Sequence, residues 1–257
     1  MSVNDLPMLV LLLVLLSSFA SAVLHGATGM AGGIVLTAIL SHIFGVRDTI
    51  VLMTFALVFS HATRVFLHRS HIDWGSVKIV LVFSAPGIGI GVIIFNHLTP
   101  TSIAAIMAIF LSLSFPIKAF AKQRKLKTSD PLLAVVGSLW GVLAGNVIGP
   151  GFVLAPFLLG RRMGRVVFVA SLAVIVLSMN LLKLIAFSAT GLASLELVVL
   201  GVIIGVITIP GNLLGKKILL SMSDEAHQRI INLMTMLIIS NFVFLCFFPN
   251  SDLLFSR

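Results

Sequence analysis

Seven apolar runs, each about long enough to cross the hydrocarbon core of a bilayer, constrain the fold more than any other feature of this sequence. A membrane-spanning helix needs about 20 apolar residues, within a range of roughly 17 to 25. Only 10% of the 257 residues are charged and 59% are hydrophobic, whereas about 25% of a soluble domain is charged. We therefore predict an all-α, polytopic membrane helix bundle with spans at Leu6–Leu24, Thr49–Leu67, Gly75–Phe95, Thr101–Ala121, Val166–Phe187, Leu195–Leu214 and Ile230–Phe248.

Three further apolar runs are shorter and contain glycine or proline: Met30–Phe44, Leu132–Val147 and Gly151–Leu159. Such runs are typical of broken or re-entrant helices, so we expect about 8 to 10 membrane segments in all. The first run, Leu6–Leu24, follows no positive charge. We interpret it as a membrane segment rather than a secretory signal, which begins with a basic stretch.

The basic residues fall almost entirely on one side of the membrane if each run reverses the direction of the chain. One side collects fourteen lysines and arginines, and the other side has only Arg47, Lys183 and Arg257. Because basic loops stay in the cytoplasm, we expect a multi-pass protein of a bacterial cell inner membrane with both termini periplasmic. The formal net charge of +9 then follows from topology and predicts no nucleic-acid partner.

The two halves of the chain resemble each other weakly. An offset of 119 residues pairs Gly26 with Gly145, and an offset of 124 pairs Gly91 with Gly215. With five chain reversals per half, the halves would enter the membrane from opposite sides, as in the inverted repeats of many transporters. We predict a first membrane repeat at residues 1–121, a basic cytoplasmic linker at 122–131 and a second membrane repeat at 132–257.

Glycine-rich breaks in the two halves predict a site for a small anion. A break exposes the N-terminus of the following helix, which has unpaired N–H donors and about half a positive charge. The alternative is that these glycines only allow tight helix crossing. The predicted binding residues at the breaks are Thr28, Gly29, Gly32 and Gly33 in the first half, and Asn146, Gly149 and Gly151 in the second.

Two cations lie inside apolar runs, each three residues after a polar side chain. His61 and Arg64 share one helix face in the first half, and Asn180 and Lys183 repeat this spacing in the second. Intramembrane cations are costly and indicate function, so we expect these four residues to bind the anion, with the cations at opposite mouths of one path. The alternative is that both cations snorkel to the interface. His25 is a candidate proton relay, against the alternative of a hydrogen-bonded filler.

The sequences around the breaks resemble the sulfite exporter TauE/SafE family, also called the TSUP transporters. The segments that carry the resemblance read HGATGMAGGIVLTAIL in the first half and GVLAGNVIGPGFVLAPFLLGRRMGR in the second. The resemblance covers about residues 8 to 248. The resemblance implies secondary transport of sulfite or an organosulfonate, with export as the expected direction, although some members of the family are linked to uptake.

The sequence contains no phosphate-binding loop, HExxH or GxSxG motif, so we expect no enzyme activity and no cofactor. No spacing of histidines suggests a metal site, and Cys246 has no partner cysteine. The partners that we expect are a small anionic substrate and the lipid bilayer, and homo-oligomerisation is left open. The alternative function is a non-transporting membrane subunit or sensor that docks a partner on basic linker residues Lys122, Arg124, Lys125 and Lys127.

Overall fold

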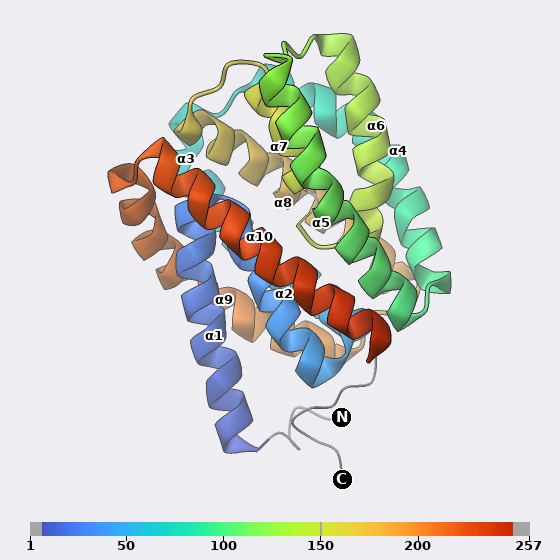
Figure 1. Ribbon diagram of the computed structural model, residues 1–257. Coiled ribbons are helices and arrows are strands. Elements are labelled where there is room, and N and C mark those ends of the chain that lie inside the picture. Colours follow the sequence, from blue (N-terminus) through green and yellow to red (C-terminus); the bar gives the residue numbers. More distant parts are fainter. Residues whose placement is uncertain (1–6, 150, 249–257) are drawn as a thin grey trace.

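The computed structural model describes residues 7–149 and 151–248 (Figure 1). In these residues the chain forms ten α-helices, one short 3₁₀ helix and no strand. The helices are α1 (Met8–Thr28), α2 (Ala31–Phe44), α3 (Val46–His68), α4 (Trp74–His97), α5 (Pro100–Gln123), α6 (Asp130–Asn146), α7 (Gly151–Leu159), α8 (Arg165–Ala189), α9 (Leu195–Ser221) and α10 (Asp224–Phe247), and the 3₁₀ helix Arg69–His71 follows α3.

Seven of the described helices are long and apolar enough to cross a membrane. They are α1, α3, α4, α5, α8, α9 and α10, and they contain the seven predicted apolar runs almost completely. Many of their large apolar side chains point outward, for example Leu9 of α1 and Ile185 of α8, which are 69% and 64% exposed. An apolar outer surface is what a lipid solvent requires, so the predicted polytopic helix bundle is confirmed.

The three shorter helices, α2, α6 and α7, belong to two hairpins, as the short apolar runs predicted. α2 pairs with α1, and α6 pairs with α7. In the α1–α2 and α6–α7 hairpins, the turn lies inside the bundle rather than at one of its ends (Figure 1). The first break is shorter than the glycine pattern suggested, because α1 continues through Gly26 and stops only at Thr28. Gly29 then reverses the chain with a φ of 84°, a left-handed conformation that glycine adopts without strain.

The chain reverses direction at each connection, so the start of α1 and the end of α10 lie at the same end of the bundle (Figure 1). The true termini, and with them Arg257, lie outside the described residues. The opposite end carries the α3–α4, α5–α6, α7–α8 and α9–α10 connections, and we call it the basic end because lysine and arginine concentrate there.

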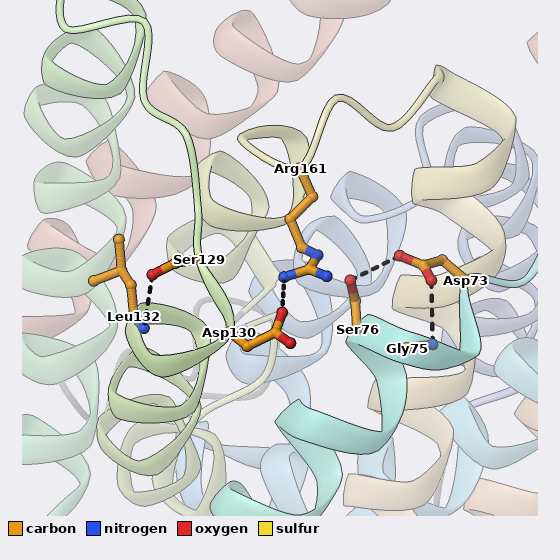
Figure 2. A network of polar contacts seen from close by, with 7 residues as sticks. All are labelled: Asp73, Gly75, Ser76, Ser129, Asp130, Leu132 and Arg161. Atoms are coloured by element: carbon orange, nitrogen blue, oxygen red, sulfur yellow. Dashed lines mark hydrogen bonds and ion pairs between the residues drawn. The ribbon is translucent and has the colours of Figure 1, made fainter.

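Polar contacts fix the helix starts at the basic end (Figure 2). The Asp73 carboxylate accepts hydrogen bonds from the Gly75 N–H at 3.1 Å and the Ser76 hydroxyl at 2.7 Å, and it caps α4. Asp130 at the start of α6 pairs with Arg161, which joins the α5–α6 and α7–α8 connections. Capping carboxylates and hydroxyls satisfy backbone N–H groups that the helix itself leaves unpaired.

The packing of the helices follows one pattern twice. α1 packs on α9 and α2 on α10, while α6 packs on α4 and α7 on α5. Adding or subtracting five from each helix number turns the first pair of contacts into the second. The central contacts, α3 with α8 and α5 with α10, map onto themselves.

Glycine pairs mark the two equivalent crossings. A Cβ on Gly215 of α9 would lie 2.7 Å from the Gly26 Cα of α1, and a Cβ on Gly145 of α6 would lie 2.7 Å from the Gly91 Cα of α4. These are the same four glycines that the two sequence offsets pair. Their small size lets the helix backbones touch, which is how helices associate in lipid.

Candidate functional site

A small buried cavity lies between the two helix breaks, and both breaks contribute to its wall. Its volume is about 20 Å³, which is room for about one water molecule. Six predicted site residues line it: His25, Gly29, Gly33, His61, Gly149 and Gly151. The rest of the lining is apolar and consists of Met30, Leu57, Ile148, Leu172 and Val176. Segments about 120 residues apart in sequence therefore meet at one place.

At the first break, Thr28 connects the end of α1 to the start of α2. Its hydroxyl donates to the Leu24 carbonyl at 2.7 Å and accepts from the Ala31 N–H at 3.1 Å. Thr28 thus holds the α2 N-terminus but does not line the cavity. Gly32 also lies outside it, because its Cα packs against the α1 backbone at Ser21 and His25, as the tight-crossing alternative predicted for a glycine here.

At the second break, Asn146 and Gly149 fix the path of the chain into α7. The Asn146 amide nitrogen donates to the Val142 carbonyl at 2.8 Å, while its side-chain oxygen is buried without a hydrogen-bond partner. Gly149 has a φ of 74°, and its Cα faces the Ile34 side chain of α2, so the two breaks are in direct contact. Pro150 lies outside the described residues.

Arg64 of α3 is buried against the first break. Its side chain is 1% exposed. The guanidinium donates to Nδ1 of His61 at 3.2 Å and to the Val169 carbonyl of α8 at 3.3 Å, and its Nη2 lies near Gly29. Arg64 therefore does not snorkel and does not sit at an open mouth.

Lys183 of α8 has the corresponding place at the second break. It is 0% exposed, its Nζ donates to the Val147 carbonyl at 3.1 Å, and it lies 5.4 Å from the centre of the Phe187 ring. Asn180, one turn earlier, is also 0% exposed, and neither its side-chain oxygen nor its nitrogen has a hydrogen-bond partner. The snorkelling alternative is thus wrong for both cations, and so is their placement at mouths, because each points inward to a break.

His25 lies between the central cavity and a neighbouring one. Its ring is 4.9 Å from that of His61, edge to face, and its Nε2 is buried without a partner. The neighbouring cavity, of about 10 Å³, is also lined by the hydroxyl residues Ser21, Ser60 and Thr208. His25 therefore contacts His61 and lines both small cavities, and its Nε2 has no hydrogen-bond partner, as a hydrogen-bonded filler would have.

Residues that the sequence did not single out complete the surroundings of the site. The Nε2 of His227, from α10, donates to the Thr28 carbonyl at 3.0 Å. Asn212 of α9 donates to the Ser60 hydroxyl at 2.9 Å. Both come from helices far away in sequence, and no local pattern marks them.

The site is electropositive and has no internal counter-charge. Among the described residues no aspartate or glutamate is buried, and the ion pairs found there, Arg161–Asp130 and Arg165–Asp224, lie at the basic end. No cluster of described residues could hold a metal ion. A buried cation is costly unless it is paired, and neither Arg64 nor Lys183 has a carboxylate partner among the described residues or lines the central cavity.

Most of the chain matches one known protein family. Residues 13–242 match the family model described as "Sulfite exporter TauE/SafE". Comparisons with curated proteins and with solved structures gave no match. Because the family model covers most of the chain, including both breaks and both buried cations, this protein belongs to the TauE/SafE sulfite exporter family, whose members are membrane transporters and not enzymes.

Proposed function

We propose that this protein is a secondary transporter that exports a small oxyanion, sulfite or an organosulfonate, and that the anion binds between the two helix breaks. The observation that carries the proposal is the pair of buried cations, Arg64 and Lys183, each at one break and each without a carboxylate partner. Both cations now donate to backbone carbonyls, Val169 and Val147, and an oxyanion offers them stronger, charge-assisted hydrogen bonds.

The N-termini of α2 and α7 would complete the binding site. Thr28 satisfies one N–H at the start of α2, and further first-turn N–H groups of both helices are available to an oxyanion. Asn180 and Asn146 supply side-chain atoms that have no partner now. These are the roles we assign to the predicted residues at the breaks, with Gly29, Gly33, Gly149 and Gly151 bringing backbone close to the anion.

We interpret the structure as a closed state of such a transporter. A cavity of about 20 Å³ holds about one water and is too small for an ion with several oxygens. We infer that inverted repeats, residues 1–121 and 132–257 joined by the linker 122–131, move against each other to open the site. Transporters with inverted repeats alternate access by this kind of rocking around a fixed site.

We assign the basic end to the cytoplasm of a bacterial inner membrane, which places both termini in the periplasm. Lysine and arginine are retained on the cytoplasmic side during insertion. The membrane potential then drives an anion outward, with about 2.3 kcal/mol per charge for each 100 mV. Export of a bare anion needs no other energy source under these conditions.

The test is uptake of ³⁵S-sulfite into proteoliposomes that contain the purified full-length protein. We expect Arg64→Gln and Lys183→Gln each to lower the flux by about tenfold or more, because hydrogen bonds to charged groups contribute about 1.5 to 3 kcal/mol. The controls are Arg69→Gln and Lys217→Gln, which remove exposed cations at the basic end, away from both breaks. Equal flux in all four variants would overturn the placement of the site.

The same assay distinguishes the transporter from the second candidate function, a non-transporting subunit that docks a partner on its basic end. If the wild-type protein moves none of sulfite, sulfate, thiosulfate, taurine and sulfoacetate, with or without a pH gradient, the transporter proposal fails. A stimulation of flux by a pH gradient, lost in His25→Gln, would assign the proton-relay role to His25.

A further inference from the structure

A second, larger cavity opens at the basic end between α5, α7 and α10. Its volume is about 460 Å³, and the polar groups that line it are Lys118, Lys122, Lys125, Gln228 and Asn232. No acidic residue is part of its lining. The cavity is therefore large enough for a hydrated oxyanion and carries positive charge only.

Lys118 marks the inner end of this cavity. Its Nζ donates to the Asn232 side-chain oxygen at 2.8 Å and so bridges α5 and α10. Lys122 lies one turn further along α5 on the same face, and Lys125 follows just after the helix end. Lys118 is partly buried while Lys122 and Lys125 are exposed, so the three ammonium groups lead from solvent inward.

A small cavity of about 20 Å³ continues this series toward the central site. It shares Lys118, Leu159, Gln228 and Asn232 with the large cavity. It shares Met30, the N-cap residue of α2, with the central cavity. Met30 is 8% exposed and separates the two, so its flexible side chain stands where a passage would open.

We propose that the cavity lined by Lys118, Lys122 and Lys125 is an anion vestibule, which collects the oxyanion at the basic end and delivers it past Met30 to the central site. This inference rests on the proposed transport function and adds the route and the residues of entry. A cleft lined by charges of one sign concentrates ions of the opposite sign and raises their rate of association. Because Lys122 and Lys125 remain in contact with water, they hold the anion weakly enough to release it inward.

The kinetic test compares two double variants that remove the same charge from the same short segment. Lys122→Gln/Lys125→Gln changes the lining, whereas Arg124→Gln/Lys127→Gln changes exposed neighbours outside it. Initial rates of ³⁵S-sulfite flux are measured against sulfite concentration on each side of the proteoliposome. For the lining variant we expect KM on the basic-end side to rise about fivefold or more, from the loss of direct charge contacts, with kcat unchanged.

High salt provides an internal control for this effect. At about 1 M ionic strength the Debye length falls to about 3 Å, so the difference in KM between the lining variant and wild type should nearly vanish. At each salt concentration, the control variant Arg124→Gln/Lys127→Gln should have the same KM as the wild-type protein. Equal KM values in the two double variants at low salt would overturn the vestibule while leaving the transport function intact.

A labelling experiment tests the vestibule even if the wild type transports no sulfite. The full-length protein in phosphatidylcholine vesicles is acetylated with and without inorganic sulfate, and the modified lysines are located by mass spectrometry. We expect sulfate to protect Lys118, Lys122 and Lys125 but not Lys127. Absence of this selective protection would overturn the proposal.

Phosphatidylglycerol vesicles identify the source of the anion. The same lysines could bind the phosphate of an anionic lipid, which has similar chemistry. Protection by phosphatidylglycerol in the absence of sulfate, together with a KM effect confined to those vesicles, would assign the cavity to a lipid headgroup and overturn its role as a vestibule.

Discussion

Replacing Gly91 by alanine tests the close crossing of α4 and α6 directly. A Cβ at this position would lie 2.3 Å from the Val142 carbonyl oxygen and 2.8 Å from the Gly145 Cα, both of them backbone atoms. Carbon and carbonyl oxygen approach to about 3.3 Å even in favourable C–H···O contacts. The helices must therefore separate locally by about 1 Å, since neither neighbour can move aside by changing a rotamer.

The expected cost is about 1 to 3 kcal/mol, the usual range for an added methyl group in a packed interior. Gly89→Ala is the matched control, because Gly89 lies on the same helix and a Cβ there meets nothing within 4 Å. In that variant alanine should be neutral or slightly stabilising, since it is the better helix former by about 1 kcal/mol. The two substitutions are chemically identical and two residues apart, so only the crossing distinguishes them.

The measurement is thermal unfolding of the purified variants in detergent. Unfolding is detected as the loss of the monodisperse gel-filtration peak after heating. We expect a lower midpoint for Gly91→Ala and an unchanged or higher one for Gly89→Ala. Gly215→Ala should behave like Gly91→Ala, because its Cβ would lie 2.3 Å from the Val23 carbonyl oxygen at the equivalent crossing. If Gly91→Ala is as stable as Gly89→Ala, the backbone contact between α4 and α6 is not as close as described.

Three further substitutions have expected outcomes that depend on single contacts. Gly149→Ala should destabilise the protein and abolish sulfite flux, because the position has a φ of 74° and a Cβ would overlap the Ile34 side chain. Normal flux in this variant would contradict the described path of the second break. Thr28→Val should lower the unfolding midpoint by the loss of the cap on the Ala31 N–H, which contributes about 1 kcal/mol, whereas Thr28→Ser should restore it. Asp130→Asn should change stability by at most about 1 kcal/mol, since its ion pair with Arg161 is exposed to solvent, and a larger loss in the same melting assay would show that the pair holds the two connections together.

The spans and breaks were predictable from sequence because a lipid solvent imposes its thickness on the chain. Each long apolar run became a helix of 21 to 27 residues, and the three short runs became the broken elements. The exact residue at which a helix breaks could be predicted less accurately from the sequence. The glycine-rich segment from Gly26 onward suggested an early break, but Gly26 lies in continuous helix because its missing side chain is used for contact with α9.

The direction of long side chains could not be derived from the sequence. Arg64 and Lys183 lie near helix ends, from which a flexible side chain can reach either the interface or the interior. Which way it goes depends on the acceptors that other helices offer, here the Val169 and Val147 carbonyls. The Lys118–Asn232 contact between α5 and α10 was missed for the same reason, since it joins residues more than a hundred positions apart.

The glycine crossings also bear on how the chain is assembled in the membrane. The main partner of α1 is α9 and that of α4 is α6, so the principal contact of both helices lies in the other half of the chain. At about 5 to 20 residues per second, synthesis of α1 ends roughly 10 to 40 seconds before that of α9. In water an unpaired face would be driven to aggregate during that delay, but in lipid a glycine-rich face carries no hydrophobic penalty. α1 can therefore remain in the bilayer as an independent helix until α9 is inserted beside it.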